Sequence, residues 1–210
     1  MDITVTQVLY VHPQNPQRRA LAGAVASIRS GSIVAYPTDS GYALGCQMDN
    51  RRGLEAMIRI RQAGRSHNST LVCRTMREVS AYARVDNDAY RWIKPYVPGP
   101  YTFILRAGPR TPRRAQNDRR KSIGVRIPEH AVVDGLLEAL DEPILSTTLI
   151  APGDAEPLAD AAEIQDRFGG QVGVIIDAGH CAPNPTSVID LSSGVPSVVR
   201  VGHGDVSPFE

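Results

Sequence analysis

The stretch SIVAYPTDSGYALGC, residues 32–46, begins with an apolar run typical of a buried strand and then turns abruptly polar. Pro37 fixes φ and removes a backbone donor, while Thr38, Asp39 and Ser40 place side-chain oxygens directly after the strand. One interpretation is a capped turn, in which Asp39 or Ser40 bonds its own backbone. The other is a ligand site, because ligands of open α/β sheets sit beyond the carboxyl ends of strands. These residues alone favour the capped turn.

The composition is that of an ordinary globular protein, with 42% hydrophobic and 21% charged side chains among 210 residues. This length can bury a sizeable core, and we expect a single domain over residues 1–210. No apolar run approaches the roughly 20 residues of a membrane span, and the first residues lack the pattern of a secretory signal. The three cysteines lie far apart without metal-ligand spacing. We therefore expect a cytoplasmic protein with no bound metal and no membrane partner.

The charges are strongly segregated along the chain, although the net charge is only +1. Residues 51–126 contain eighteen Lys or Arg and five acids, whereas residues 127–210 contain two Arg and fourteen acids. Such asymmetry indicates a polyanion partner for the central segment, and Arg, which supplies most of the charge, binds phosphate through a planar fork. The alternative is that the two halves mix in one fold and their fields cancel.

Helical and strand patterns alternate along the chain. The first helix is expected at 16–30, with Asn15 as its N-cap, and the strand 32–36 follows. Further helices are expected at 49–62, 77–83, 86–96, 129–142 and 158–168. Further strands are expected at 69–73, 101–107, 121–127, 143–150, 172–176, 186–191 and 197–201. This order predicts one α/β domain with a mixed, twisted sheet flanked by helices.

The helix expected at 49–62 carries an arginine on its apolar side. At 100° per residue, Leu54, Met57 and Ile58 define the apolar face, and Arg61 falls inside that arc. A guanidinium aimed at a core is costly unless an anion meets it. Arg61 is therefore a candidate phosphate contact, or else its side chain extends to water or bonds the last carbonyls of the helix.

A second basic cluster occupies the connection between the strands 101–107 and 121–127. A loop of this kind predicts contacts to a phosphate backbone, with affinity that falls as salt rises. The alternative is a solvated, disordered loop. Because aromatic residues are few, at 5%, stacking on single strands is poorly supported, and duplex or folded RNA fits better. The residues expected to bind RNA are Arg51, Arg52, Arg110, Arg113, Arg114, Arg119, Arg120 and Lys121.

The common catalytic motifs are missing from the sequence. It contains no Gly-x-Ser-x-Gly elbow, no Walker loop and no Rossmann glycine pattern. The five histidines are scattered, and none lies at a recognisable spacing from Ser146 or Ser187. We therefore propose no side-chain nucleophile or base from the sequence.

Seven stretches resemble the YrdC/YciO family in the family's own order, and the YciO branch most closely. They cover nearly the whole chain: GSIVAYPTDSGYALGC, RIRQ, PGPYTFIL, KSIGVRIP, LSTTLIAPG, PTSVIDLS and VVRVGHGDV. The resemblance implies a concave, positively charged cavity on a twisted α/β sheet, with the polar turn after residue 36 at its rim. It also implies synthesis of threonylcarbamoyl-adenylate from ATP, threonine and bicarbonate for tRNA modification. Family members are also described as binding double-stranded RNA.

The resemblance assigns site residues position by position. Those that match nucleotide contacts are Arg61, Asn68, Ser122, Thr148 and Arg200. Those that match threonine contacts are Thr38, Arg59, Arg126 and Ser187. It also implies that ATP, carrying Mg²⁺ on its phosphates, is a substrate and that no cofactor is tightly bound.

Two positions depart from the family's pattern. The family's Lys-x-Arg is Arg59-Ile60-Arg61 here, and its Ser-x-Asn is matched to Thr148-Leu149-Ile150. Losing such a buried polar contact costs about 1–3 kcal/mol, which is roughly ten- to a hundredfold in rate. We therefore expect a protein that binds RNA, double-stranded or tRNA-like, and nucleotide, with at most weak synthase activity. The alternative is a fully active threonylcarbamoyl-AMP synthase.

Overall fold

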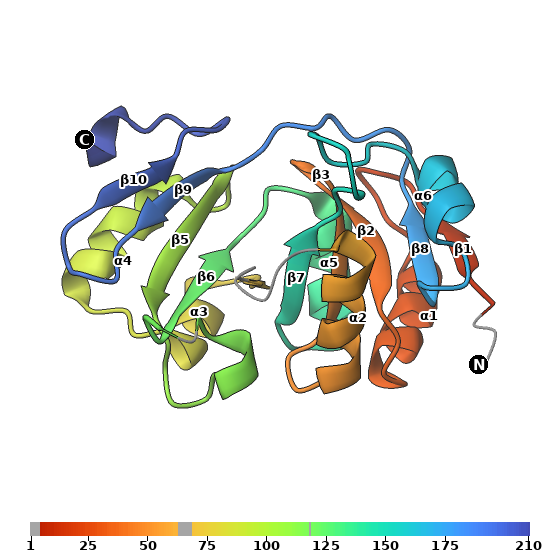
Figure 1. Ribbon diagram of the computed structural model, residues 1–210, viewed down its shortest axis with the longest axis horizontal. Helices are drawn as coiled ribbons and strands as arrows, with labels where there is room; N and C mark the ends of the chain where they lie inside the picture. The colour runs from red at the N-terminus through yellow and green to blue at the C-terminus, as the bar shows by residue number, and fades with distance from the viewer. Residues whose placement is uncertain (1–4, 63–68, 118) are drawn as a thin grey trace.

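The polar stretch that follows residue 36 is the turn of a β-hairpin in the computed structural model (Figure 1). Strand β2 (Val34–Thr38) pairs antiparallel with β3 (Gly41–Gln47) along its whole length, so the strand predicted to end at residue 36 continues to Thr38. Pro37 is tolerated because the parallel neighbour on the other side, β8 (Val174–Asp177), pairs only with the first two residues of β2.

The structure describes residues 5–62, 69–117 and 119–210. The helices are α1 (Arg18–Arg29), α2 (Arg51–Arg61), α3 (Met76–Tyr82), α4 (Asn87–Ile93), α5 (Ala131–Leu140) and α6 (Ala161–Phe168). The other strands are β1 (Gln7–Tyr10), β4 (Thr70–Val72), β5 (Tyr101–Arg106), β6 (Ser122–Arg126), β7 (Ile144–Thr148), β9 (Ser187–Asp190) and β10 (Ser197–Arg200). None of the described helices is long and apolar enough to cross a membrane.

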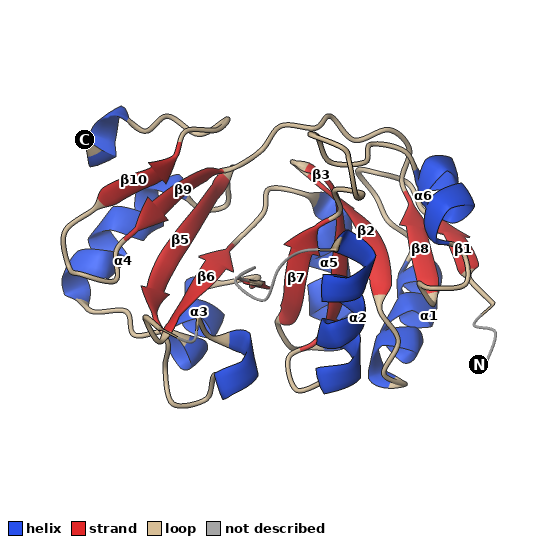
Figure 2. Cartoon of the chain, viewed as in Figure 1, coloured by secondary structure: helices blue, strands red, loops and turns tan. Residues whose placement is uncertain are grey.

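Ten strands in the described ranges form one sheet, in the order β1-β8-β2-β3-β7-β4-β6-β5-β9-β10 (Figure 2). Four neighbouring pairs are parallel: β1 with β8, β2 with β8, β4 with β6, and β5 with β9. The others, including β3 with β7 and β5 with β6, are antiparallel. The expected mixed sheet flanked by helices is confirmed.

Two apolar clusters cover opposite faces of this sheet. Alternation along β2 separates them, because Val34 and Tyr36 belong to one cluster and Ala35 to the other. Helices α1 and α5 pack on the face of Val34 and Tyr36. Helices α2, α3, α4 and α6 contribute to the cluster on the opposite face. Among the described residues, the α1–α5 cluster reaches β4 but includes no residue of β5, β6 or β9.

The start of the first helix differs from the prediction. Gln17 is the N-cap of α1 and its side chain makes no capping hydrogen bond, so the assignment of Asn15 as N-cap was wrong. The backbone N–H groups of Gln14 and Asn15 instead donate to Nδ1 of His12, at 3.2 Å and 3.1 Å. A turn bonded to the His12 imidazole therefore precedes the helix, and α1 begins at Arg18, two residues after the predicted start at residue 16.

Candidate functional site

The turn between β2 and β3 is capped by the side chain of Thr38. Its hydroxyl donates to the carbonyl of Gly41 at 2.7 Å and accepts from the backbone N–H of Ser40 at 3.1 Å. Gly41 has a φ of +93°, and a Cβ there would lie 2.7 Å from Pro157, so glycine is required. The capped turn was thus the correct geometry, although Thr38 and not Asp39 or Ser40 bonds the backbone.

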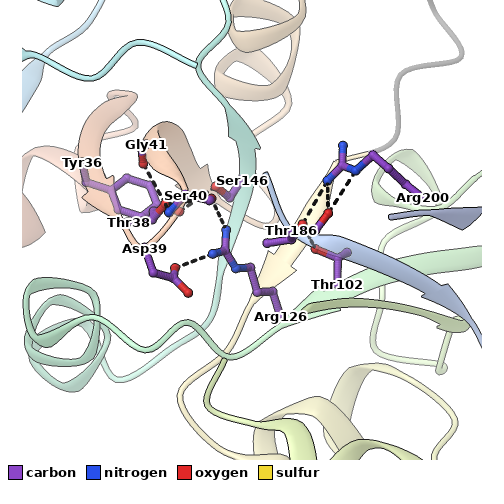
Figure 3. A network of polar contacts seen from close by, with 10 residues as sticks. All are labelled: Tyr36, Thr38, Asp39, Ser40, Gly41, Thr102, Arg126, Ser146, Thr186 and Arg200. Carbon is purple, nitrogen blue, oxygen red and sulfur yellow. Dashed lines mark hydrogen bonds and ion pairs between the residues drawn. The ribbon is translucent and has the colours of Figure 1, made fainter. Parts of the chain in front are cut away.

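With Thr38 holding the turn, the two residues at its tip are available to an arginine. Arg126, the last residue of β6, reaches the turn with a side chain that is 8% exposed (Figure 3). Its Nη1 donates to Ser40 Oγ at 2.8 Å, and its Nη2 forms an ion pair with Asp39. Burial lowers the pKa of Arg126, and the Asp39 carboxylate opposes this shift.

The Asp39–Arg126 pair is incompletely satisfied by the described residues. Nε of Arg126 and Oδ2 of Asp39 are both buried without a hydrogen-bond partner. Nδ1 of His130 is also buried without a hydrogen-bond partner. Burial lowers the pKa of His130, the Asp39 carboxylate opposes this shift, and the charge of Arg126 adds to it. Buried polar groups are nearly always bonded in native proteins, so unpaired donors and acceptors here indicate room for a ligand or water.

The strands next to the pair present small and polar residues on one face. Ser146 of β7 lies opposite Thr70 of β4, and Thr70 lies opposite Gly124 of β6. A Cβ on Gly124 would lie 3.2 Å from Thr70 Oγ1 and 3.4 Å from a methyl carbon of Thr102, so these side chains share one face. By alternation, Arg126 lies on the same face as Gly124. This polar face lies where the α1–α5 cluster ends.

Tyr36 closes the polar face under the β2–β3 turn. Its hydroxyl lies 2.6 Å from Ser146 Oγ, and Ser146 donates to the carbonyl of Leu44 at 3.0 Å. Because a serine has one hydroxyl proton, Tyr36 must be the donor to Ser146. Burial raises the pKa of Tyr36 to about 12, so the phenol stays neutral and can keep that role.

Arg200 supplies a second guanidinium near the polar face. Its Nε and Nη2 donate to the carbonyl of Thr186 at 3.0 Å and 2.7 Å, and Nη2 also reaches Thr186 Oγ1 at 3.0 Å. The Thr186 hydroxyl, just before β9, in turn lies 3.0 Å from the Thr102 hydroxyl of β5. The charge of Arg200 adds to burial in lowering the pKa of Arg126. Figure 3 shows the Arg200 group facing the β2–β3 turn, with Arg126 between them.

Ser187 follows Thr186 and is fully buried. The resemblance predicts that its side chain contacts the substrate threonine. The Ser187 hydroxyl donates to the carbonyl of Gly204 at 2.6 Å and accepts from the N–H of Gly202 at 2.9 Å. The side chain therefore fixes the chain segment after β10. A direct contact with threonine stays a prediction.

Arg61 occupies the position that the helix geometry predicted but reaches the opposite side of β7. Its Nη1 donates to Thr147 Oγ1 at 2.8 Å, and burial lowers the pKa of Arg61. Since successive side chains of a strand alternate, Thr147 points away from the face that carries Ser146 and Thr148. The hydrogen bond to Thr147 thus places Arg61 on the face that α2 covers.

The other assigned residues are distributed around the polar face. Ser122 is buried in β6, two residues before Gly124 and on the same face, and Thr148 is half-buried in β7, two residues after Ser146. Arg59 is exposed on α2. Asn68 lies outside the described residues. The nucleotide and threonine roles of all of these stay predictions.

The residues expected to bind RNA lie at several places on the surface. Arg51 and Arg52 begin α2, and Arg114 donates to the carbonyl of Asp49 just before that helix, which brings the 113–115 turn against the α2 start. Arg119, Arg120 and Lys121 precede β6, while Arg110 lies over the ring of Tyr82 at 4.9 Å. All eight predicted side chains are exposed: Arg51, Arg52, Arg110, Arg113, Arg114, Arg119, Arg120 and Lys121.

Part of this charge is paired with acidic side chains. Among the described residues, ion pairs between the segments 51–126 and 127–210 involve Arg74 with Asp134 and Glu138, and Arg120 with Asp190. Arg51 and Arg91 pair within the central segment, and Arg126 pairs with Asp39. The eight residues expected to bind RNA stay exposed whether or not they are paired.

The sequence assignments missed several residues of the site. Asp39 and Ser40 were considered as turn residues or as part of an unspecified ligand site, and Tyr36, Ser146 and His130 were not assigned a role. Alternation could have identified Ser146, because a serine two residues before Thr148 in a strand shares its face. The described residues contain no group of three or more His, Cys, Asp or Glu that could hold a metal ion.

Comparison with known proteins places this geometry in context. The Sua5/YciO/YrdC family model, described as "Telomere recombination", matches residues 26–202. The uncharacterized protein YciO of Escherichia coli K12 is 48% identical over 98% of this chain and 100% of its own length. The crystal structure of E. coli YciO superimposes with a TM-score of 0.94, covering 98% of this chain and 100% of that one.

More distant relatives carry more informative names. The threonylcarbamoyl-AMP synthase of Klebsiella pneumoniae is 28% identical over 86% of this chain and 95% of its own length. The structure of P. abyssi Sua5 complexed with L-threonine is 23% identical, with a TM-score of 0.85, and covers 93% of this chain and 57% of that one. The latter similarity establishes a shared fold.

Proposed function

Because the chain belongs to the Sua5/YciO/YrdC family, we propose that it binds nucleotide and threonine on the polar face around Arg126 and binds structured RNA through its exposed arginines. We further propose that it forms threonylcarbamoyl-AMP from ATP, threonine and bicarbonate, but only slowly. Mg²⁺ enters with the ATP phosphates rather than through a protein carboxylate cage.

The observation that carries the proposal is the buried, incompletely satisfied Asp39–Arg126 pair. A guanidinium has five N–H donors, of which the turn uses one for Ser40 and one for Asp39. The buried and unpaired Nε supports binding of a carboxylate or a phosphate oxygen, while Oδ2 of Asp39 supports binding of an ammonium or hydroxyl group. A threonine zwitterion offers the carboxylate, the ammonium and the hydroxyl group, and a nucleotide offers the phosphate oxygens. Relatives named for L-threonine and threonylcarbamoyl-AMP support this choice.

Slow turnover follows from the residues that replace the family's Lys and Asn. Arg59 keeps a positive charge but is exposed on α2, and it cannot supply a compact ammonium. Strand β7 ends at Thr148, and Ile150, at the family's Asn position, follows two residues later in the connection after the strand. The missing amide is therefore replaced by the apolar side chain of Ile150. The hydroxyl of Thr148, at the family's Ser position, retains part of the contact.

Threonine and nucleotide binding can be tested by calorimetry with L-threonine, AMP and ATP–Mg²⁺. The Arg126→Met variant should lose at least roughly tenfold in affinity, because a charged hydrogen bond contributes about 1.5–3 kcal/mol. The matched control is Arg91→Met, which removes an exposed arginine from α4. Equal affinities for the wild type and Arg126→Met would remove the Arg126 site from the proposal.

RNA binding can be tested by filter binding of a duplex across a salt series. Affinity should fall as salt rises, and replacing Arg113 and Arg114 with Gln should reduce the slope of log affinity against log salt by roughly two if both contact phosphate. The Arg91→Gln variant is the control. A lack of binding at low salt, or a slope independent of salt, would refute the RNA component and leave the small-molecule site standing.

A further inference from the structure

A concave site lies beside α4, at the end of β5 that carries Arg106. It is a pocket of about 500 Å³ between the start of α4 and the turn that joins β9 to β10. Arg84 and Arg106 contribute its charge, Trp92 and Leu191 are among its apolar walls, and the backbone turn 192–194 forms one side. Pockets for small ligands commonly have volumes of about 300–1,000 Å³.

The two arginines are direct cross-strand neighbours. Ala83 and Ala107 form an antiparallel bridge, and the N–H of Arg84 donates to the carbonyl of Arg106 at 2.8 Å. Directly opposed residues of an antiparallel pair have Cβ atoms about 4.5–5.5 Å apart on the same face, and like charges there are destabilising. In the described part of the chain, neither guanidinium takes part in an ion pair. The two arginine side chains thus start from neighbouring backbone positions, and both line the same pocket.

One guanidinium is oriented by the fold. Nε of Arg106 donates to the carbonyl of Ser192 at 2.7 Å, which ties that side chain to the β9–β10 turn. The pocket also contains a carboxylate, Asp86, but one of its oxygens accepts from the backbone N–H of Ala89 as the N-cap of α4. The lining therefore keeps a net positive charge.

We propose that this pocket binds a small phosphate ester with a flat or apolar body. Two adjacent guanidinium groups match the oxygens of a phosphate dianion, since Arg binds phosphate through parallel N–H donors. The apolar walls and the indole of Trp92 suit the attached body, because aromatic rings and aliphatic side chains contact planar groups favourably. The site is independent of the function proposed for the Arg126 region.

Trp92 makes the proposal directly measurable, because it is the only tryptophan of the chain. Its fluorescence should change saturably when AMP is added, and adenosine, which has no phosphate, should give no saturable change. The Arg84→Gln/Arg106→Gln double variant should bind AMP with an affinity lowered by roughly tenfold or more. Arg91→Gln is the control, because it removes an exposed arginine of the same helix that does not line the pocket.

Two further measurements distinguish AMP binding in this pocket from nucleotide binding at Arg126 and from RNA binding. The AMP response should persist in Arg126→Met, which lacks the guanidinium of the polar face. A response of equal affinity in the double variant, or the loss of the response in Arg126→Met, would overturn the assignment. So would quenching by duplex RNA but not by AMP, which would make this surface part of a nucleic-acid interface.

Discussion

Removing the carboxylate of Asp39 should destabilise the protein far more than a surface substitution does. The side chains of Arg126 and Asp39 are 8% and 17% exposed, so Asp39→Asn leaves a buried guanidinium without its counter-charge. Breaking a buried pair on one side typically costs about 3–5 kcal/mol. We expect a value near the lower end, since an Asn oxygen can still accept one hydrogen bond from Arg126. Urea denaturation measures this change in the free energy of unfolding.

The control for this experiment is Asp88→Asn, which breaks an ion pair whose side chains are 75% and 78% exposed. Exposed pairs contribute about 0–1 kcal/mol, so this variant should stay close to the wild type. The double variant Asp39→Leu/Arg126→Met should recover much of the loss, because an apolar pair of similar volume can replace a buried ion pair. If Asp39→Asn and Asp88→Asn lost the same free energy, the buried pair would not have the structural role assigned to it.

Three further predictions concern the surroundings of that pair. Ser146→Ala should lower the free energy of unfolding by about 1–3 kcal/mol, since it leaves the buried Tyr36 hydroxyl without its acceptor, and Tyr36→Phe in the same background should recover part of it. Because burial lowers the pKa of His130 in the folded state, the unfolded chain binds the proton more readily, so stability should fall as the pH drops below about 6.5. His130→Gln should reduce that decline in denaturation series at pH 7.5 and 5.5. Pyrophosphate should stabilise Asp39→Asn more than the wild type in thermal unfolding, because the buried charge of Arg126 then lacks its internal anion.

The sequence predicted the fold well because its signals are local. Strands such as 121–127 alternate Ile123 and Val125 with smaller or polar residues, and this period of two survives in β6. Helix α2 has Asn50 as its N-cap, whose side chain accepts from the N–H of Gly53 at 2.8 Å, close to the predicted start. The first helix was misplaced because a histidine-centred turn competes with a good capping residue.

The site was harder to predict because its contacts join distant positions. Asp39 and Arg126 are separated by 87 residues, and no local pattern indicates that a turn residue meets the end of β6. The burial of Arg61 was predictable from helical periodicity, but its side of the sheet depends on the register of β7 against β3. Pairings of this kind follow from tertiary structure rather than from spacing along the chain.

The most direct test of the proposed function compares the wild type with the Klebsiella pneumoniae threonylcarbamoyl-AMP synthase under the same conditions. Both proteins receive ATP–Mg²⁺, L-threonine and bicarbonate, and the formation of pyrophosphate and threonylcarbamoyl-AMP is measured. The wild type should turn over roughly ten- to a hundredfold more slowly, as expected for the loss of a buried polar contact. Restoring the amide with Ile150→Asn, together with Arg59→Lys, should raise the rate. A wild-type rate equal to that of the synthase would contradict this account and make the chain a fully active synthase.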